Sequence, residues 1–137
     1  MPVTNFPEYA RRITDLLDAL LAAGQIRSVD FQIDQRSMLR GFIRGLLVFD
    51  DDAELHFREY VDVTLDEPKL SYAYHYQDAN QTLIFRYDNA AHRPPLAQPE
   101  HKHSSIGATV APAPTLAQVI DEILKGKLPA RLASRLV

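Results

Sequence analysis

The 137-residue sequence contains no cysteine and no tryptophan. Without cysteine the chain forms no disulfide, and any metal site in it must be built without a thiolate ligand. A fold that does not depend on disulfides suits a reducing compartment, so we expect a cytoplasmic protein.

The chain also has no long hydrophobic run near its start. Residues 6–21 include five charged side chains, which excludes a signal-peptide core or a membrane span there. We therefore expect no contact with a membrane. The formal net charge of −3 gives no overall attraction to nucleic acid, so any RNA contact must come from a local basic patch.

The hydrophobic pattern predicts a helix at each end of the chain. Asn5 precedes a proline and a glutamate in a typical capped start, and Gly24 follows the last leucines at helical spacing. A second capping box begins at Thr115, and we expect its helix to end at Gly126. The predicted segments are an N-terminal helix within 1–24, a C-terminal helix over 115–126 and a basic tail at 127–137.

Between the helices, apolar and polar residues alternate in five segments, which is typical of half-buried strands. Short connections between them favour antiparallel neighbours. These segments are 29–34, 38–49, 54–63, 69–77 and 82–87. We predict one α+β domain over 1–137. Its single antiparallel five-stranded meander sheet occupies 25–88, the two helices pack on the sheet, and 89–114 forms a loop rich in histidine and proline.

Glu59 is the unusual residue of the third predicted strand. It shares a parity with Leu55, Phe57 and Val61, so a regular strand directs its carboxylate to the apolar face. Burying an unpaired carboxylate costs several kcal/mol. Glu59 should therefore find an arginine, a tyrosine hydroxyl or a backbone donor, or lie at a cleft or the sheet edge. The alternative is a general base with a perturbed pKa.

His101, Lys102 and His103 form the sharpest local feature of the sequence. Residues two apart in an extended segment project to the same side, so both imidazoles can reach one target. Because histidine titrates near neutral pH, the pair could act as acid and base. Together with Asp88 and His92 the pair could instead bind zinc. A solvated polar loop is the third interpretation.

Four further basic residues are candidates for a site: His75 as a catalytic residue, and Arg86, Arg40 and Arg44 as phosphate ligands. His75 lies on the small-residue face of the fourth predicted strand, which leaves room above it for a ligand. If His75 and Arg86 face the same way on neighbouring strands, an imidazole and a guanidinium meet there. Arg40 and Arg44 share one face of the second predicted strand.

Four short motifs in order carry a family resemblance. Together they make the sequence resemble the TumE-type toxin family of bacterial type II toxin–antitoxin systems. The resemblance implies a small cytoplasmic toxin with a cognate antitoxin as partner and RNA as its target. The motifs are Arg58-Glu-Tyr-Val-Asp62, Tyr72-Ala-Tyr-His-Tyr-Gln-Asp78, Leu83-Ile-Phe-Arg-Tyr-Asp-Asn-Ala-Ala-His92 and His101-Lys-His103. By the resemblance, the positions carried over are Glu59, His75, Arg86, Asp88, His92, His101 and His103.

The leading hypothesis is a toxin that cleaves RNA by general acid–base catalysis without a cofactor. The order helix–meander–helix also resembles barnase- and RelE-like ribonucleases in outline, which is an analogy of fold alone. Glu59 or His75 would act as the base, and His101 or His103 as the acid. Arg86, Lys102, Arg40 and Arg44 would bind phosphate.

Three other hypotheses stay open, one of which is a structural homologue of the toxins that has lost toxicity. A metal-dependent hydrolase would use Asp88, His92, His101 and His103 to hold zinc. A non-enzymatic module would use the histidine-rich loop to bind a protein partner. The expected partners are an RNA substrate and an antitoxin, and the sequence leaves a homodimer open.

Overall fold

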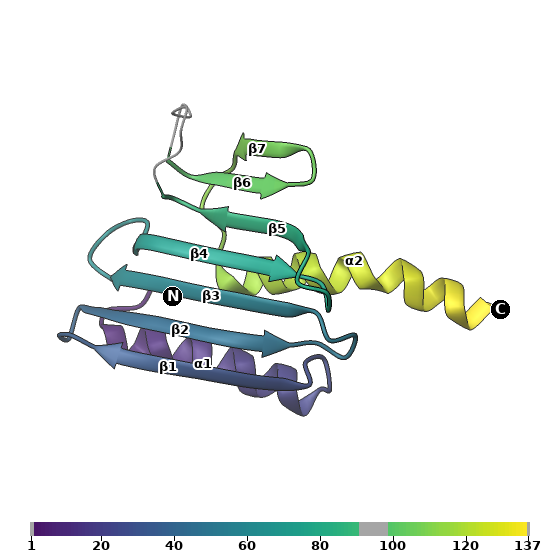
Figure 1. Cartoon of the computed structure of the whole chain (residues 1–137). Helices are drawn as coiled ribbons and strands as arrows, with labels where there is room; N and C mark the ends of the chain where they lie inside the picture. The colour runs from purple at the N-terminus through teal and green to yellow at the C-terminus, as the bar shows by residue number, and fades with distance from the viewer. Residues whose placement is uncertain (1, 91–98, 137) are drawn as a thin grey trace.

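The structure, a computed structural model, describes residues 2–90 and 99–136. Seven antiparallel strands follow one another in sequence order across one sheet, and both helices pack on the same face of it (Figure 1). The helices are α1 (Phe6–Ala22) and α2 (Leu116–Leu136), and the strands are β1 (Ser28–Gln35), β2 (Arg40–Val48), β3 (Glu54–Asp62), β4 (Lys69–Gln77), β5 (Leu83–Asp88), β6 (His101–Ser104) and β7 (Gly107–Val110).

The α+β class is confirmed, but the prediction of five strands was wrong because the sheet has seven. The two additional strands, β6 and β7, lie within the segment predicted to be a loop. Each is only four residues long, and β6 directs a lysine to the helix-covered face. The Lys102 Nζ lies 5.2 and 5.0 Å from the ring centroids of Phe85 and Tyr87. A strand with this composition has no apolar alternation to reveal it.

Both helix starts are as predicted. The Asn5 side chain accepts a hydrogen bond of 2.8 Å from the third residue of α1, and Gly24 after the helix has a φ of +71°. Thr115 and Gln118 exchange the two hydrogen bonds of a capping box. The helix α2, however, continues past Gly126 to Leu136, so the predicted stop was wrong.

The sheet has two different faces. Its helix-covered face forms the hydrophobic core with apolar residues of β2 to β5, such as Leu47, Phe57, Tyr74 and Phe85. The opposite face, here called the open face, carries the polar residues that alternate with them, such as His56 and Arg86. None of the described helices is long and apolar enough to cross a membrane.

Candidate functional site

The strand register aligns a basic row on the open face. His75 of β4 lies opposite Arg86 of β5, which in turn lies opposite His103 of β6. In the adjacent row, Asp88 of β5 lies opposite His101 of β6. Five of the residues proposed from the sequence thus come together, and we call His75, Arg86, Asp88, His101 and His103 the histidine–arginine site.

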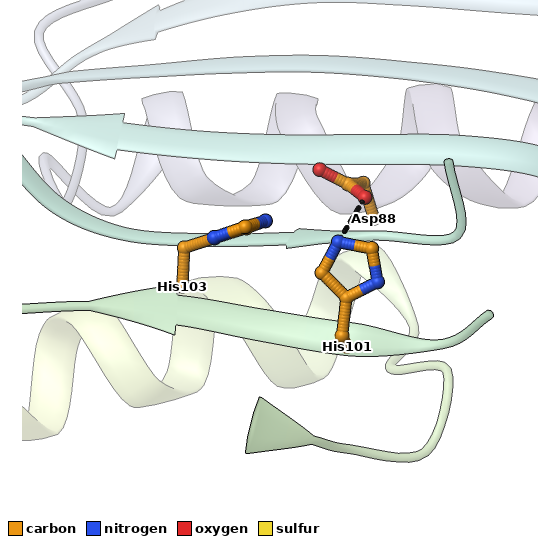
Figure 2. A group of neighbouring side chains, drawn as sticks. All are labelled: Asp88, His101 and His103. Atoms are coloured by element: carbon orange, nitrogen blue, oxygen red, sulfur yellow. Dashed lines mark ion pairs between the residues drawn. The ribbon is translucent and has the colours of Figure 1, made fainter. Parts of the chain in front are cut away.

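Asp88 links the members of this site. Asp88 is 4 % exposed, and one of its carboxylate oxygens lies 2.8 Å from the Nε2 of His101 (Figure 2). The other oxygen accepts a hydrogen bond of 2.7 Å from the Nε of Arg86. One buried carboxylate therefore fixes the orientation of a guanidinium and an imidazole together.

His101 is buried between two oxygen atoms. His101 is 2 % exposed, and its Nδ1 lies 2.5 Å from the carbonyl oxygen of Pro99. A carbonyl oxygen and a carboxylate oxygen are both acceptors, so each ring nitrogen of His101 faces an acceptor. His103 lies beside it with ring centroids 4.7 Å apart, and it is less buried than His101.

The hydrogen bonds of His75 define the tautomer of its ring. The Arg86 NH1 lies 3.3 Å from the His75 Nδ1, and because arginine can only donate, Nδ1 must be the acceptor. The Nε2 then carries the proton and donates to the Gln77 side chain at 3.1 Å. Burial lowers the pKa of His75, and the positive charge of Arg86 lowers it further. A neutral imidazole with its lone pair beside a guanidinium is the result.

Asp88, His101 and His103 could also hold a metal ion. One ligand atom from each residue lies within 4.8 Å of the others. The carbonyl of Pro99 on the far nitrogen of His101 resembles the second hydrogen bond that metal-binding histidines usually make. His92, the fourth predicted ligand, lies outside the described residues.

Glu59 lies on the helix-covered face, so the sheet separates it from the histidine–arginine site. Its residue is 1 % exposed, and it accepts hydrogen bonds of 2.5 Å from the hydroxyl groups of Tyr9 and Tyr74. Burial raises the pKa of Glu59 despite these two donors. The carboxylate therefore has the tyrosine partner that the sequence left as one of two interpretations.

The remaining predicted phosphate ligands lie apart from one another. Lys102 faces the helices and forms an ion pair of 3.0 Å with Glu122 of α2. Arg40 pairs with Asp62 at 2.9 Å, at the far end of its strand. Of these candidates, Arg44 lines a hollow that also reaches the histidine–arginine site.

This hollow contains two residues that the sequence analysis did not select, His56 and Arg58. It has a volume of about 390 Å³, and its other lining residues include Arg44, His75 and Arg86. The sequence does place both residues on the polar side of β3, since they alternate with its core positions. Only the register shows that His56 lies directly opposite His75.

A family model described as toxin TumE matches residues 13–128 of the chain. The chain belongs to the TumE toxin family. No curated protein and no solved structure matched it. Membership of the TumE family supports the role of a toxin, and every described residue of the histidine–arginine site lies within the matched range.

Proposed function

We propose that this TumE-family toxin is an endoribonuclease that cleaves RNA on the open face of its sheet and that a cognate antitoxin restrains it. The observation that carries the proposal is the row His75–Arg86–His103, in which two imidazoles lie on either side of one guanidinium. RNA cleavage without a metal needs a base, an acid and a cation for the phosphate. This row contains one of each.

His75 is the base in this proposal. It is neutral, and its lone pair at Nδ1 accepts a hydrogen bond from the guanidinium of Arg86. A phosphate bound to Arg86 would therefore bring the ribose 2′-hydroxyl close to that lone pair. Asp88 positions Arg86 through its 2.7 Å hydrogen bond, and His101 pairs with the other oxygen of Asp88. Asp88 and His101 act as positioning residues.

His103 is the acid. It lies on the other side of Arg86 from His75, two strand spacings or about 10 Å away across the sheet. The 2′-oxygen attacks phosphorus as His75 takes its proton. The bond from phosphorus to the 5′-oxygen breaks, and that oxygen receives a proton from His103. The products are a 2′,3′-cyclic phosphate and a 5′-hydroxyl.

The test is cleavage of RNA by the purified protein, with analysis of the product ends. We expect 2′,3′-cyclic phosphate ends, and a loss of about 10²- to 10⁴-fold in rate for His75→Ala and for His103→Ala. The control is Arg12→Ala, which removes an exposed arginine from α1. Growth arrest by wild type with intact cellular RNA, or full activity in both histidine variants, overturns the proposal.

A second candidate is a metal-dependent hydrolase, favoured by the approach of Asp88, His101 and His103. These three ligands would leave a fourth position for water, and a bound zinc ion would lower the pKa of that water. Zinc at one equivalent per chain in the purified protein, with activity lost on chelation, supports this candidate. Full activity in chelator with cyclic phosphate ends supports the proposal above.

A further inference from the structure

The open face carries an aromatic pair on the side of the arginines away from the histidines. The rings of Phe42 and Tyr60 stack with centroids 4.3 Å apart and an angle of 19° between their planes. Phe42 is 42 % exposed, and the guanidinium of Arg36 lies 5.2 Å from the centroid of its ring. Exposed aromatic rings beside arginines are typical of surfaces on which unpaired bases stack.

Between this aromatic pair and the histidines lies a pair of arginines. Arg44 of β2 is directly opposite Arg58 of β3, and both are exposed. Like charges directly opposite in a sheet are destabilising. Gln32 accepts two hydrogen bonds from Arg44, at 2.9 and 2.7 Å. The side chain of Arg58, by contrast, makes no hydrogen bond or ion pair with the side chain of any described residue. A bound anion would relieve this repulsion.

Two hollows connect these features. The hollow described above reaches His75 and Arg86, and a second one of about 400 Å³ is lined by Arg36 and Phe42. They share Gln32, Arg44 and Arg58, so they join at the arginine pair. We call the two together the open-face groove.

The charge of the open-face groove is opposite to that of the whole chain. Its lining includes four arginines and two aspartates, although the chain has a formal net charge of −3. One of the aspartates, Asp34, already pairs with Arg36 at 3.1 Å. The basic patch that RNA binding requires is therefore present locally, along the path that leads to the histidine–arginine site.

We infer that the open-face groove binds single-stranded RNA, with a phosphate at Arg44 and Arg58 and an unpaired base against Phe42. This inference rests on the proposed function for its class of ligand. It adds a requirement for unpaired RNA, because a base in a duplex is stacked on its neighbours and cannot reach the Phe42 ring. The preference for unpaired RNA would then come from a nucleotide beside the one that is cleaved.

The test measures binding separately from cleavage. The probe is a fluorescent single-stranded oligonucleotide with 2′-O-methyl groups throughout, which has no 2′-hydroxyl and cannot be cleaved, and the readout is anisotropy. Phe42→Ala should weaken binding about 5- to 150-fold, the range for loss of one base-stacking contact. Phe42→Tyr keeps the ring and should bind within about twofold of wild type. Leu70→Ala is the control, because Leu70 is 41 % exposed and lies outside the groove.

The arginine pair has its own prediction. Arg58→Ser should weaken binding and lower the slope of log affinity against log salt by about one. Arg12→Ser is the matched control on α1 and should leave the slope unchanged. A duplex of the same sequence should bind more weakly than the single strand.

The outcomes separate this inference from the proposed cleavage. Equal RNA affinity of wild type, Phe42→Ala and Arg58→Ser overturns the inference that the open-face groove binds RNA, even when wild type cleaves RNA. RNA binding that depends on Phe42, in a protein that cuts no RNA, supports the inference about the open-face groove. The same result overturns the proposed endoribonuclease activity. Failure of the antitoxin to neutralise Phe42→Ala, with RNA affinity unchanged, assigns the surface to a protein partner and also overturns the inference.

Discussion

Replacing Glu59 should destabilise the fold and leave RNA cleavage intact. The carboxylate joins α1 to the sheet, because its two hydrogen-bond donors are Tyr9 of α1 and Tyr74 of β4. A hydrogen bond to a charged group contributes about 1.5–3 kcal/mol, and a buried hydroxyl left without a partner adds its own cost. We expect Glu59→Ala to lower the free energy of unfolding by about 3–5 kcal/mol. The melting temperature should fall by roughly 10–20 °C.

The pH dependence gives a sharper test of the same site. Burial raises the pKa of Glu59 above its ordinary value of 4.5. A group with a raised folded-state pKa contributes stability that is fully present below pH 4.5 and is lost as the pH rises through the folded-state pKa. The Gln side chain of Glu59→Gln does not titrate, so this pH-dependent contribution to stability is absent from the variant. The destabilisation caused by Glu59→Gln should therefore be larger at pH 4 than at pH 8.

The measurement is urea unfolding of wild type and Glu59→Gln at both pH values, followed by circular dichroism. Since one pKa unit corresponds to about 1.4 kcal/mol, the change in the stability difference reports the size of the shift. The same samples are assayed for RNA cleavage. Equal stability differences at both pH values refute the electrostatic reasoning. A folded Glu59→Gln protein that has lost cleavage would instead place Glu59 in the chemistry.

Three further predictions follow from single contacts. Gly41→Ala should destabilise the protein by about 1–3 kcal/mol in urea unfolding, because the added methyl group overlaps the buried ring of Phe6. Asn5→Ala should cost about 1 kcal/mol in the same assay and Asn5→Asp much less, since the lost contact is the helix cap. Lys102→Met should keep its rate of RNA cleavage, because the amine faces Glu122 on the helix side; a loss of 10²-fold would contradict that placement.

The sequence predicted the parts of the fold whose local chemistry is explicit. Both helix N-caps and the left-handed Gly24 follow from short motifs, and the long strands follow from alternation. The strand β6 was missed because the helix-side position between its two histidines is a lysine. The aliphatic part of Lys102 covers Phe85 and Tyr87, which is the role that an apolar residue normally has in a strand.

The end of α2 was misplaced for a related reason. A glycine permits a helix stop but does not require one, since it costs only about 1 kcal/mol inside a helix. Gly126 is not among the glycines with positive φ, and Lys127 beyond it forms an ion pair with Asp51 of the β2–β3 turn. The contact that supports this part of the helix involves a residue 76 positions away, which no local pattern reveals.

The candidate site was predictable as to face and residue type, but not as to register. Alternation placed His75 and Arg86 on the polar sides of their strands, and the structure makes them neighbours. Whether they meet depends on the hairpin between them, where the pairing shifts at Tyr76 and Gln77. A shift of one residue in a strand reverses the face of every side chain beyond it. His56 and Arg58 were missed for the same reason.

One face of the sheet requires apolar side chains and the other carries polar ones. Because successive side chains of a strand point to opposite faces, one chain provides both. On the helix-covered face, even the carboxylate of Glu59 is accepted because two tyrosines satisfy it. On the open face, Arg44 and Arg58 lie opposite each other and are both exposed, and like charges in this arrangement are destabilising. A negatively charged ligand removes that repulsion, so binding stabilises the folded state. If RNA is that ligand, as proposed above, the arginine pair is stabilised in the bound protein and destabilising in the free one.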